Sequence, residues 1–130
     1  MILGLGIDLV EIQRIDAALQ RWGERFAGRI LQPKEWRSPL TPTFLAGRFA
    51  AKEALVKALG TGFTQGIGWH DLEIAPNPGA PHVCLRGKAH ERFQNLGGHC
   101  LHLSISHSQT HATAVAIIEG IPGSFPDFSR

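Results

Sequence analysis

Two carboxylates and a lysine stand out because they occur among small and apolar residues. Glu53 and Lys57 belong to the stretch FAAKEALVKALGTG (residues 49–62), which is otherwise mostly Ala, Leu, Val and Phe. At about 100° per residue, these two side chains and Gly60 share one face of a helix. Asp8 follows two glycines in GLGID. Paired carboxylates are typical of Mg²⁺ sites, where water and phosphate oxygens complete the coordination of the ion.

The same residues allow simpler interpretations. Glu53 and Lys57 fit a surface ion pair that contributes about 0.3–0.5 kcal/mol, and Asp8 fits the N-cap of a following helix. The sequence alone does not bring Asp8 and Glu53 together. If they do meet, Lys57 and a second basic pair, Arg48 and Lys52, are available to neutralise phosphate oxygens. The pattern then predicts phosphoryl chemistry with Mg²⁺.

A polar strand face is predicted in HLSISH, residues 102–107. Because side chains alternate along a strand, His102, Ser104 and Ser106 point away from the neighbouring leucines and isoleucine. That face fits plain solvent exposure, or a polar ligand site with His107 at the strand end as a phosphate-binding group. A zinc site is a further alternative, and its ligands would be His99, His102, His107 and His111.

A basic stripe is predicted on the first helix. Arg14, Arg21 and Arg25 fall within about 40° of one another if the helix runs without interruption. Such a stripe is commonly a solvated helix face. With Phe26 nearby, it also fits docking against an acidic partner.

The expected elements define an α+β chain with a small, mostly antiparallel sheet packed against a long helix and shorter helices. In the first strand, 2–10, we expect the face of Leu3, Leu5, Ile7 and Leu9 to be packed and the face of Gly4, Gly6 and Asp8 to be open. Thr43 is the expected N-cap of the long helix, 44–59, and Gly60 its terminator. The other expected elements are a helix over 12–26 divided near Gly23, a loop over 32–43, strands over 69–75 and 82–86, a helix over 87–96, and a hairpin of 100–106 and 112–119.

Composition limits the classes of function. A chain of 130 residues with a net charge of +2 fits one domain, expected over 1–120 with a tail over 121–130, and the charge does not indicate nucleic-acid binding. The stretch GLGIDL has Leu9 where the dinucleotide-binding motif GxGxxG requires its third glycine. The Gly-rich stretch GTGFTQGIG lacks the GKS or GKT ending of a P-loop. Cys84 and Cys100 fit reduced thiols, and no segment has the length of a membrane span or the form of a signal peptide. We therefore expect a cytoplasmic protein without membrane contacts.

Three blocks of the sequence resemble one family. GIDLVEIQRI, FLAGRFAAKEALVKALGTG and HLSISHSQTHATA are similar, in this order, to the holo-[acyl-carrier-protein] synthases, the short and trimeric type of 4′-phosphopantetheinyl transferase. The resemblance covers residues 1–120. The blocks around Asp8 and Glu53 are specific together, whereas the histidine block is weak alone.

The resemblance implies a reaction and its site. The family transfers 4′-phosphopantetheine from coenzyme A to a serine of apo acyl carrier protein in fatty acid biosynthesis, and releases adenosine 3′,5′-bisphosphate. By position, Asp8 and Glu53 would bind Mg²⁺, and Lys57 would bind the phosphate near the transferred phosphorus. The proton of the serine would go to Glu53 or to a water on the metal. The residues expected to contact the coenzyme A nucleotide are Arg48, Gly60 and His107.

The resemblance also implies partners. Arg14, Arg21 and Arg25, with Phe26, would contact the acidic helix of the carrier protein. A homotrimer with sites between protomers would let the His107 strand of one subunit approach the Asp8 and Glu53 site of its neighbour.

Two rival functions remain open at the level of sequence. A Mg²⁺-dependent phosphoesterase would need a third carboxylate or histidine at the metal, for which Glu11 and Asp71 are candidates. A basic, non-enzymatic adaptor would use the arginine stripe alone, and would leave Asp8 and Glu53 without a role.

Overall fold

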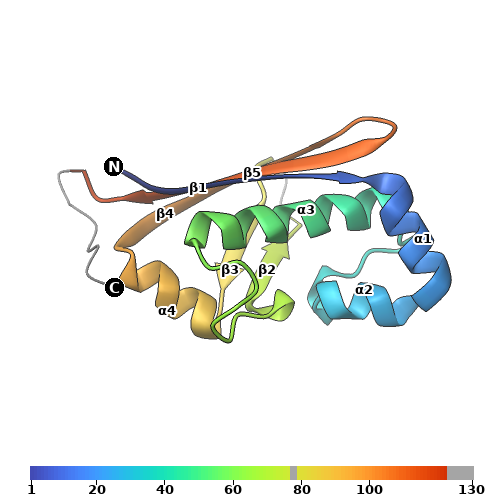
Figure 1. Cartoon of the computed structure of the whole chain (residues 1–130), viewed down its shortest axis with the longest axis horizontal. Coiled ribbons are helices and arrows are strands. Elements are labelled where there is room, and N and C mark those ends of the chain that lie inside the picture. The colour runs from blue at the N-terminus through green and yellow to red at the C-terminus, as the bar shows by residue number, and fades with distance from the viewer. Residues whose placement is uncertain (77–78, 123–130) are drawn as a thin grey trace.

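The computed structural model describes residues 1–76 and 79–122 and is dominated by one long central helix. Figure 1 shows this helix, α3, running along one face of a sheet, with smaller elements gathered on its other side. In chain order the elements are β1 (Ile2–Glu11), α1 (Ile12–Trp22), α2 (Glu24–Ile30), the 3₁₀ turn η1 (Pro33–Glu35), α3 (Pro42–Leu59), the 3₁₀ turn η2 (Trp69–Asp71), β2 (Leu72–Ala75), β3 (His82–Leu85), α4 (Gly87–Asn95), β4 (Gly98–His107) and β5 (His111–Gly120).

The strands form two antiparallel sheets. The larger has the order β1-β5-β4, so that the first strand of the chain pairs with the last, and β2 pairs with β3 in a separate hairpin. In the larger sheet β1 places Asp8 opposite Ala114 of β5. The predicted α+β class and its mostly antiparallel sheet are confirmed.

Local sequence explains where α3 begins and ends. The Thr41 hydroxyl accepts a hydrogen bond from the Phe44 amide at 3.1 Å, and Pro42 occupies the first turn, where no amide donor is needed. The predicted cap at Thr43 is therefore wrong by two residues. Gly60 ends the helix in the left-handed conformation with φ of 78°, as predicted.

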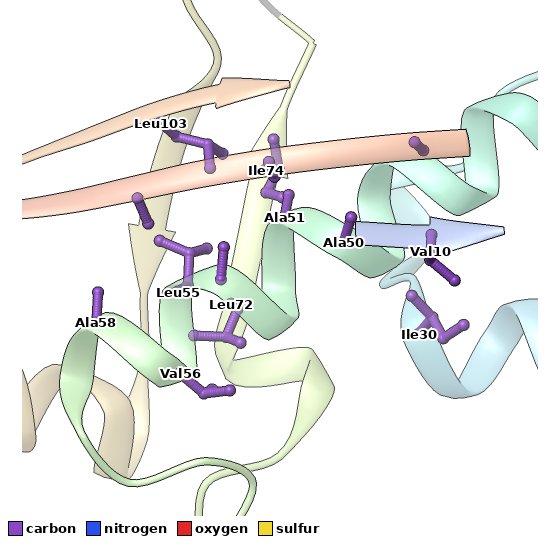
Figure 2. Packing of buried hydrophobic residues seen from close by; sticks show 14 of the residues in the cluster. Val10, Ile30, Ala50, Ala51, Leu55, Val56, Ala58, Leu72, Ile74 and Leu103 are labelled. Atoms are coloured by element: carbon purple, nitrogen blue, oxygen red, sulfur yellow. The ribbon is translucent and has the colours of Figure 1, made fainter. Parts of the chain in front are cut away.

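The core forms around α3 because this helix is enclosed on both sides. Figure 2 shows Leu55 and Val56 among buried side chains of the strands. On one side α3 faces the larger sheet, and on the other it meets Leu72 and Ile74 of β2, both fully buried. A helix buried on nearly all faces is apolar all round, which accounts for the alanine-rich sequence.

Except at Leu3, which is partly buried against the core, the packed face of β1 is the reverse of the predicted one. Gly4 and Gly6 face α3, and a Cβ atom at either position would collide with a backbone carbonyl of that helix. Leu5, Ile7 and Leu9 point outward and are 64–65% exposed. The glycines are thus needed for close approach of strand and helix, and do not open a ligand face.

Other boundaries follow the prediction with small changes. Gly23, with φ of 61°, divides the first helical segment as expected, and as a result Arg25 lies on a helix separate from Arg14 and Arg21. Residues 69–71 form a 3₁₀ turn, so the strand predicted over 69–75 begins only at Leu72.

Eight residues of the predicted tail, 123–130, lie outside the described residues. Among the described helices, none combines the length and apolar character needed to cross a membrane.

The close contact of β1 with α3 gives a first prediction. Replacing Gly6 with Ala should lower the free energy of unfolding by about 3 kcal/mol, because the added methyl group pushes the strand off the helix backbone. Chemical denaturation measures this change.

Gly28→Ala is the matched control for Gly6→Ala. Gly28 lies in α2, and the nearest atom to its added Cβ is in the Trp36 ring at 3.9 Å. We expect its stability to be unchanged or raised by up to about 1 kcal/mol, since alanine favours a helix. Equal effects of the two substitutions would contradict the packing described for β1.

Candidate functional site

The structure brings Asp8, Glu53 and Lys57 together at the contact of β1 with α3. Asp8 shares the inward face of β1 with the glycines, and its side chain is only 16% exposed. The Lys57 ammonium donates to the Asp8 carboxylate at 3.1 Å and to the Ile7 carbonyl at 3.0 Å. Glu53 lies one helical turn before Lys57 on the same face.

The electrostatics of Glu53 indicate two neighbouring carboxylates whose negative charges repel each other. Partial burial raises the pKa of Glu53, the neighbouring charge of Asp8 raises it further, and Lys57 partly offsets both. Two carboxylates that repel each other are a favourable site for a cation. The interpretation of Glu53 and Lys57 as a simple surface ion pair does not fit, because Lys57 pairs with Asp8 across the strand.

The donor set of this site fits a hard divalent cation. Asp8 and Glu53 offer carboxylate oxygens only, and Mg²⁺ commonly uses one or two protein carboxylates together with water and substrate phosphates. Within residues 1–76 and 79–122, no third histidine, cysteine or carboxylate joins the pair. Asp71, one candidate for such a ligand, instead accepts a hydrogen bond from the Gly68 amide at 2.8 Å.

A second polar region lies on the opposite flank of α3. A cavity of about 730 Å³ opens between the start of α3, β4 and the segment after β2. Its lining includes Arg37, Arg48, Ser104 and His107. The volume is within the range of small-molecule sites.

Arg48 carries the strongest sign of a ligand in this cavity. Its Nε atom is buried and has no hydrogen-bond partner in the described part of the chain, and burial lowers the pKa of the guanidinium. The Phe44 ring contacts the Arg48 guanidinium at 4.8 Å and that of Arg37 at 5.3 Å. An anion that pairs with these two cations would remove the cost of the unpaired donor.

Sequence reasoning missed Arg37. It lies in the predicted loop over 32–43, which the structure confirms as irregular apart from η1 and the first residues of α3. A cation in a loop has no fixed position until the loop is packed. The one sequence signal was its position shortly before FLAGR, the block that contains Arg48.

The two polar regions do not meet within one chain. Arg48 and Lys57 are nine positions apart, which places their side chains about 180° apart around a helix. Asp8, Glu53 and Lys57 are absent from the lining of the cavity that contains Arg48 and His107. One chain thus carries two separate candidate sites on opposite flanks of α3, called here the first half-site (Asp8, Glu53 and Lys57) and the second half-site (Arg37, Arg48 and His107).

Lys52 is not part of either half-site, so its expected role in binding phosphate is wrong. Its side chain is fully buried and forms an ion pair with Glu35 at 2.8 Å. It also donates to the carbonyls of Ile30 and Trp69. Lys52 therefore ties α2, η1 and η2 to the core, and removal of one partner from such a buried pair costs about 3–5 kcal/mol.

The four-histidine zinc site is not formed. His102 lies near the open end of the β4–β5 hairpin and His107 at its loop, five residues or about 16 Å away along the strand. The alternation predicted for β4 is otherwise confirmed, because Leu103 is buried while His102, Ser104 and Ser106 are exposed.

The arginines of the predicted stripe are exposed, but they do not line one helix. Arg14 and Arg21 lie on α1, where the Arg21 guanidinium stacks on the Trp22 ring at 4.8 Å, and Arg25 lies on α2. Phe26 is partly buried and packs against the core. It is therefore a weaker candidate for a partner contact than Trp22, which is 51% exposed.

Gly60 has a clear conformational role at the end of α3. Its left-handed backbone terminates the helix beside the functional face, and the Arg92 side chain donates to the preceding Leu59 carbonyl at 2.9 Å. An added Cβ at Gly60 would lie 3.4 Å from the Arg92 guanidinium.

The fold matches that of a class of solved enzymes. The holo-[acyl-carrier-protein] synthase of Neisseria meningitidis aligns with a TM-score of 0.82 and 34% identity, covering 92% of this chain and 99% of its own. The Helicobacter pylori enzyme, solved in complex with coenzyme A, aligns with a TM-score of 0.77 and 34% identity, covering 88% and 99%.

Sequence comparison gives the family. A model described as the 4′-phosphopantetheinyl transferase superfamily matches residues 4–116. The holo-[acyl-carrier-protein] synthase of Solidesulfovibrio magneticus is 54% identical over 124 residues, which are 92% of this chain and 100% of that protein. The chain belongs to the 4′-phosphopantetheinyl transferase superfamily, and the resemblance predicted from its three sequence blocks is confirmed.

Proposed function

We propose that this protein transfers 4′-phosphopantetheine from coenzyme A to a serine of apo acyl carrier protein, as a Mg²⁺-dependent enzyme of the cytoplasm that serves fatty acid biosynthesis. The observation that carries the proposal is the grouping of Asp8, Glu53 and Lys57 at one contact of strand and helix. The relatives named holo-[acyl-carrier-protein] synthase, and the one in complex with coenzyme A, support the choice of substrates.

The residues of the first half-site have distinct tasks in such a transfer. Asp8 and Glu53 would hold Mg²⁺, which when bound would neutralise charge on the coenzyme A pyrophosphate. Lys57 is half exposed and reaches Asp8 through a flexible side chain. It is therefore free to turn toward a phosphate oxygen and to stabilise charge in the transition state.

The acceptor serine must lose its proton during the transfer. Its oxygen forms a bond to the phosphorus next to pantetheine, the pyrophosphate bond breaks, and adenosine 3′,5′-bisphosphate leaves with the electron pair. That proton would be accepted either by the Glu53 carboxylate or by a water held with Mg²⁺.

The second half-site suits the nucleotide part of coenzyme A. Arg48 and Arg37 would pair with its 3′-phosphate, because the buried Arg48 Nε needs an acceptor and planar guanidinium groups bind phosphate at two points. His107 lines the same cavity and would add a further contact.

An apolar sheet face supports the proposed homotrimer. Leu5, Ile7 and Leu9 of β1 are exposed. Beside them in register on β5 lie Ile117 and Val115. A contiguous apolar face of this kind marks an interface between proteins. Covering it with copies of the same chain would also let the Arg48 and His107 region of one subunit meet the Asp8 region of another.

The exposed arginines support docking of an acidic carrier. Helices α1 and α2 form one end of the molecule (Figure 1). Arg14 and Arg21 lie on α1 and Arg25 on α2, and the Arg21 guanidinium stacks on the exposed Trp22 ring. An aromatic side chain among arginines is the usual composition of a binding hot spot.

Neither rival function gains support from the described residues. The phosphoesterase would require a third metal ligand, and none joins Asp8 and Glu53 in residues 1–76 and 79–122. The adaptor would leave unexplained why two carboxylates are kept together at the cost of a raised Glu53 pKa.

The transfer itself is the first test of this function. Incubation of the protein with coenzyme A, Mg²⁺ and an apo acyl carrier protein should give a phosphopantetheine adduct on the carrier, measured by mass spectrometry. Glu53→Gln should slow the transfer by about 100-fold or more. Its thermal stability without Mg²⁺ should be unchanged or higher, because the substitution removes a repelled carboxylate.

Glu91→Gln is the control for that experiment. Glu91 is an exposed glutamate on α4 that pairs with Lys88 three residues earlier. It should keep both the transfer rate and the stability of the wild type. Absence of any adduct with a cognate carrier, or a Glu53→Gln variant as active as the wild type, would refute the proposal.

The docking surface is tested by the dependence of rate on carrier concentration. Arg14→Ala should raise the KM for the carrier about twofold to fivefold with little change in kcat, since an exposed ion pair contributes up to about 1 kcal/mol. Added salt should raise the KM for the carrier more in the wild type than in the Arg14→Ala variant. Lys88→Ala, which removes a cation on α4, should leave the KM unchanged. An equal KM for Arg14→Ala and the wild type would exclude this surface.

The shared site is tested by mixing two variants, each impaired in a different half-site. His107→Ala and Glu53→Gln chains, when co-expressed at equal levels, should recover roughly one quarter of the wild-type activity, because that fraction of composite sites receives both intact residues. Sites contained within one chain would recover no activity. The trimer is checked in parallel by sedimentation, and a fully active monomer would contradict it.

A further inference from the structure

A third cluster of potential ligands lies away from both half-sites, at the open end of the β4–β5 hairpin. Cys100, His102 and Glu119 each offer one ligand atom, and these atoms lie within 4.8 Å of one another. We propose that this cluster is a binding site for Zn²⁺ or a similar transition metal, distinct from the Mg²⁺ site and independent of the proposed transferase function.

The sheet register brings the three side chains together. Cys100 and His102 are two residues apart on β4, so they share a face of the strand. Glu119 pairs directly with Cys100 across the hairpin. The register of β4 becomes irregular just beyond this pair, between Gly98 and Cys100. His102 pairs with Ile117, so the cluster lies on the outward face of the sheet, next to the apolar side chains proposed to form the subunit interface.

The donors select a different metal from the one expected at Asp8. A thiolate, an imidazole and a carboxylate are the three ligand types that bind Zn²⁺, whereas Mg²⁺ prefers oxygen alone. Three protein ligands leave a fourth tetrahedral position for water. Among the described residues this is the one group of three or more such side chains close enough to share an ion.

Only small movements are needed to bind an ion. The His102 ring nitrogen lies 2.8 Å from the Glu119 carboxylate, so these two already point at each other. Around a tetrahedral Zn²⁺ with bonds of 2.0–2.3 Å, ligand atoms stand about 3.3–3.8 Å apart. In the single chain His102 and Glu119 are 53% and 45% exposed, so these side chains can separate by such an amount without disturbing the core of the subunit.

Direct titration with metal tests the site. Protein freed of metal by a chelator should bind one Zn²⁺ per chain in buffer containing Mg²⁺. Cobalt in place of zinc should give a thiolate-to-cobalt charge-transfer band in the near ultraviolet, which only a cysteine ligand produces. Cys100→Ser, His102→Gln and Glu119→Gln should each lower the zinc affinity by about 100-fold or more, because loss even of supporting groups around a metal costs 10- to 100-fold.

Two control variants identify the site. Cys84→Ser removes the other free cysteine, which lies on β3, and should bind zinc as the wild type does. The double variant Asp8→Asn with Glu53→Gln should also keep zinc binding. The site is refuted if wild-type protein shows no cobalt–thiolate band, if the Cys100 and His102 variants keep full affinity, or if binding disappears with Asp8 and Glu53.

Discussion

The contact of two glycines with the backbone of α3 determines the arrangement of the candidate active site. Gly4 and Gly6 let β1 lie against the carbonyl groups of Ala54 and Ala58, closer than any side chain would allow. Asp8 is the next residue on that face of β1, so the same close approach carries its carboxylate to Glu53 and Lys57. The grouping of these three side chains is thus a consequence of how strand and helix pack.

This packing has an energetic cost that fits a binding site. A carboxyl group whose pKa is raised on folding binds its proton more tightly in the folded state, so stability falls as the pH rises through the window between its usual value and the raised one. Ionised Glu53 therefore opposes folding at neutral pH, and a cation between Asp8 and Glu53 would relieve that opposition. Lys52, by contrast, is fully paired with Glu35 and stabilises the fold.

Features that depend on local backbone preference and on the periodicity of the sequence were predicted correctly. The glycine that ends α3, the break at Gly23 and the alternation along β4 follow from backbone preference and periodicity, and the paired carboxylates were identified by residue type. The sequence failed where two elements meet. Glycines in β1 were interpreted as an open face because alternation does not say which side approaches a helix. Lys52 was interpreted as a phosphate-binding cation because its partner Glu35 lies in the predicted loop, whose path no local rule fixes.

The central claim is that Asp8 and Glu53 form one electrostatic unit, and the pKa of Glu53 measures it most directly. Carbon-detected NMR titration of the glutamate carboxyl groups, in the absence of divalent cations, should give Glu53 a pKa above the usual glutamate value. Asp8→Asn should lower that pKa part of the way and leave the contribution of burial. An unshifted Glu53 in the wild type, or the same pKa with and without the Asp8 charge, would contradict the account.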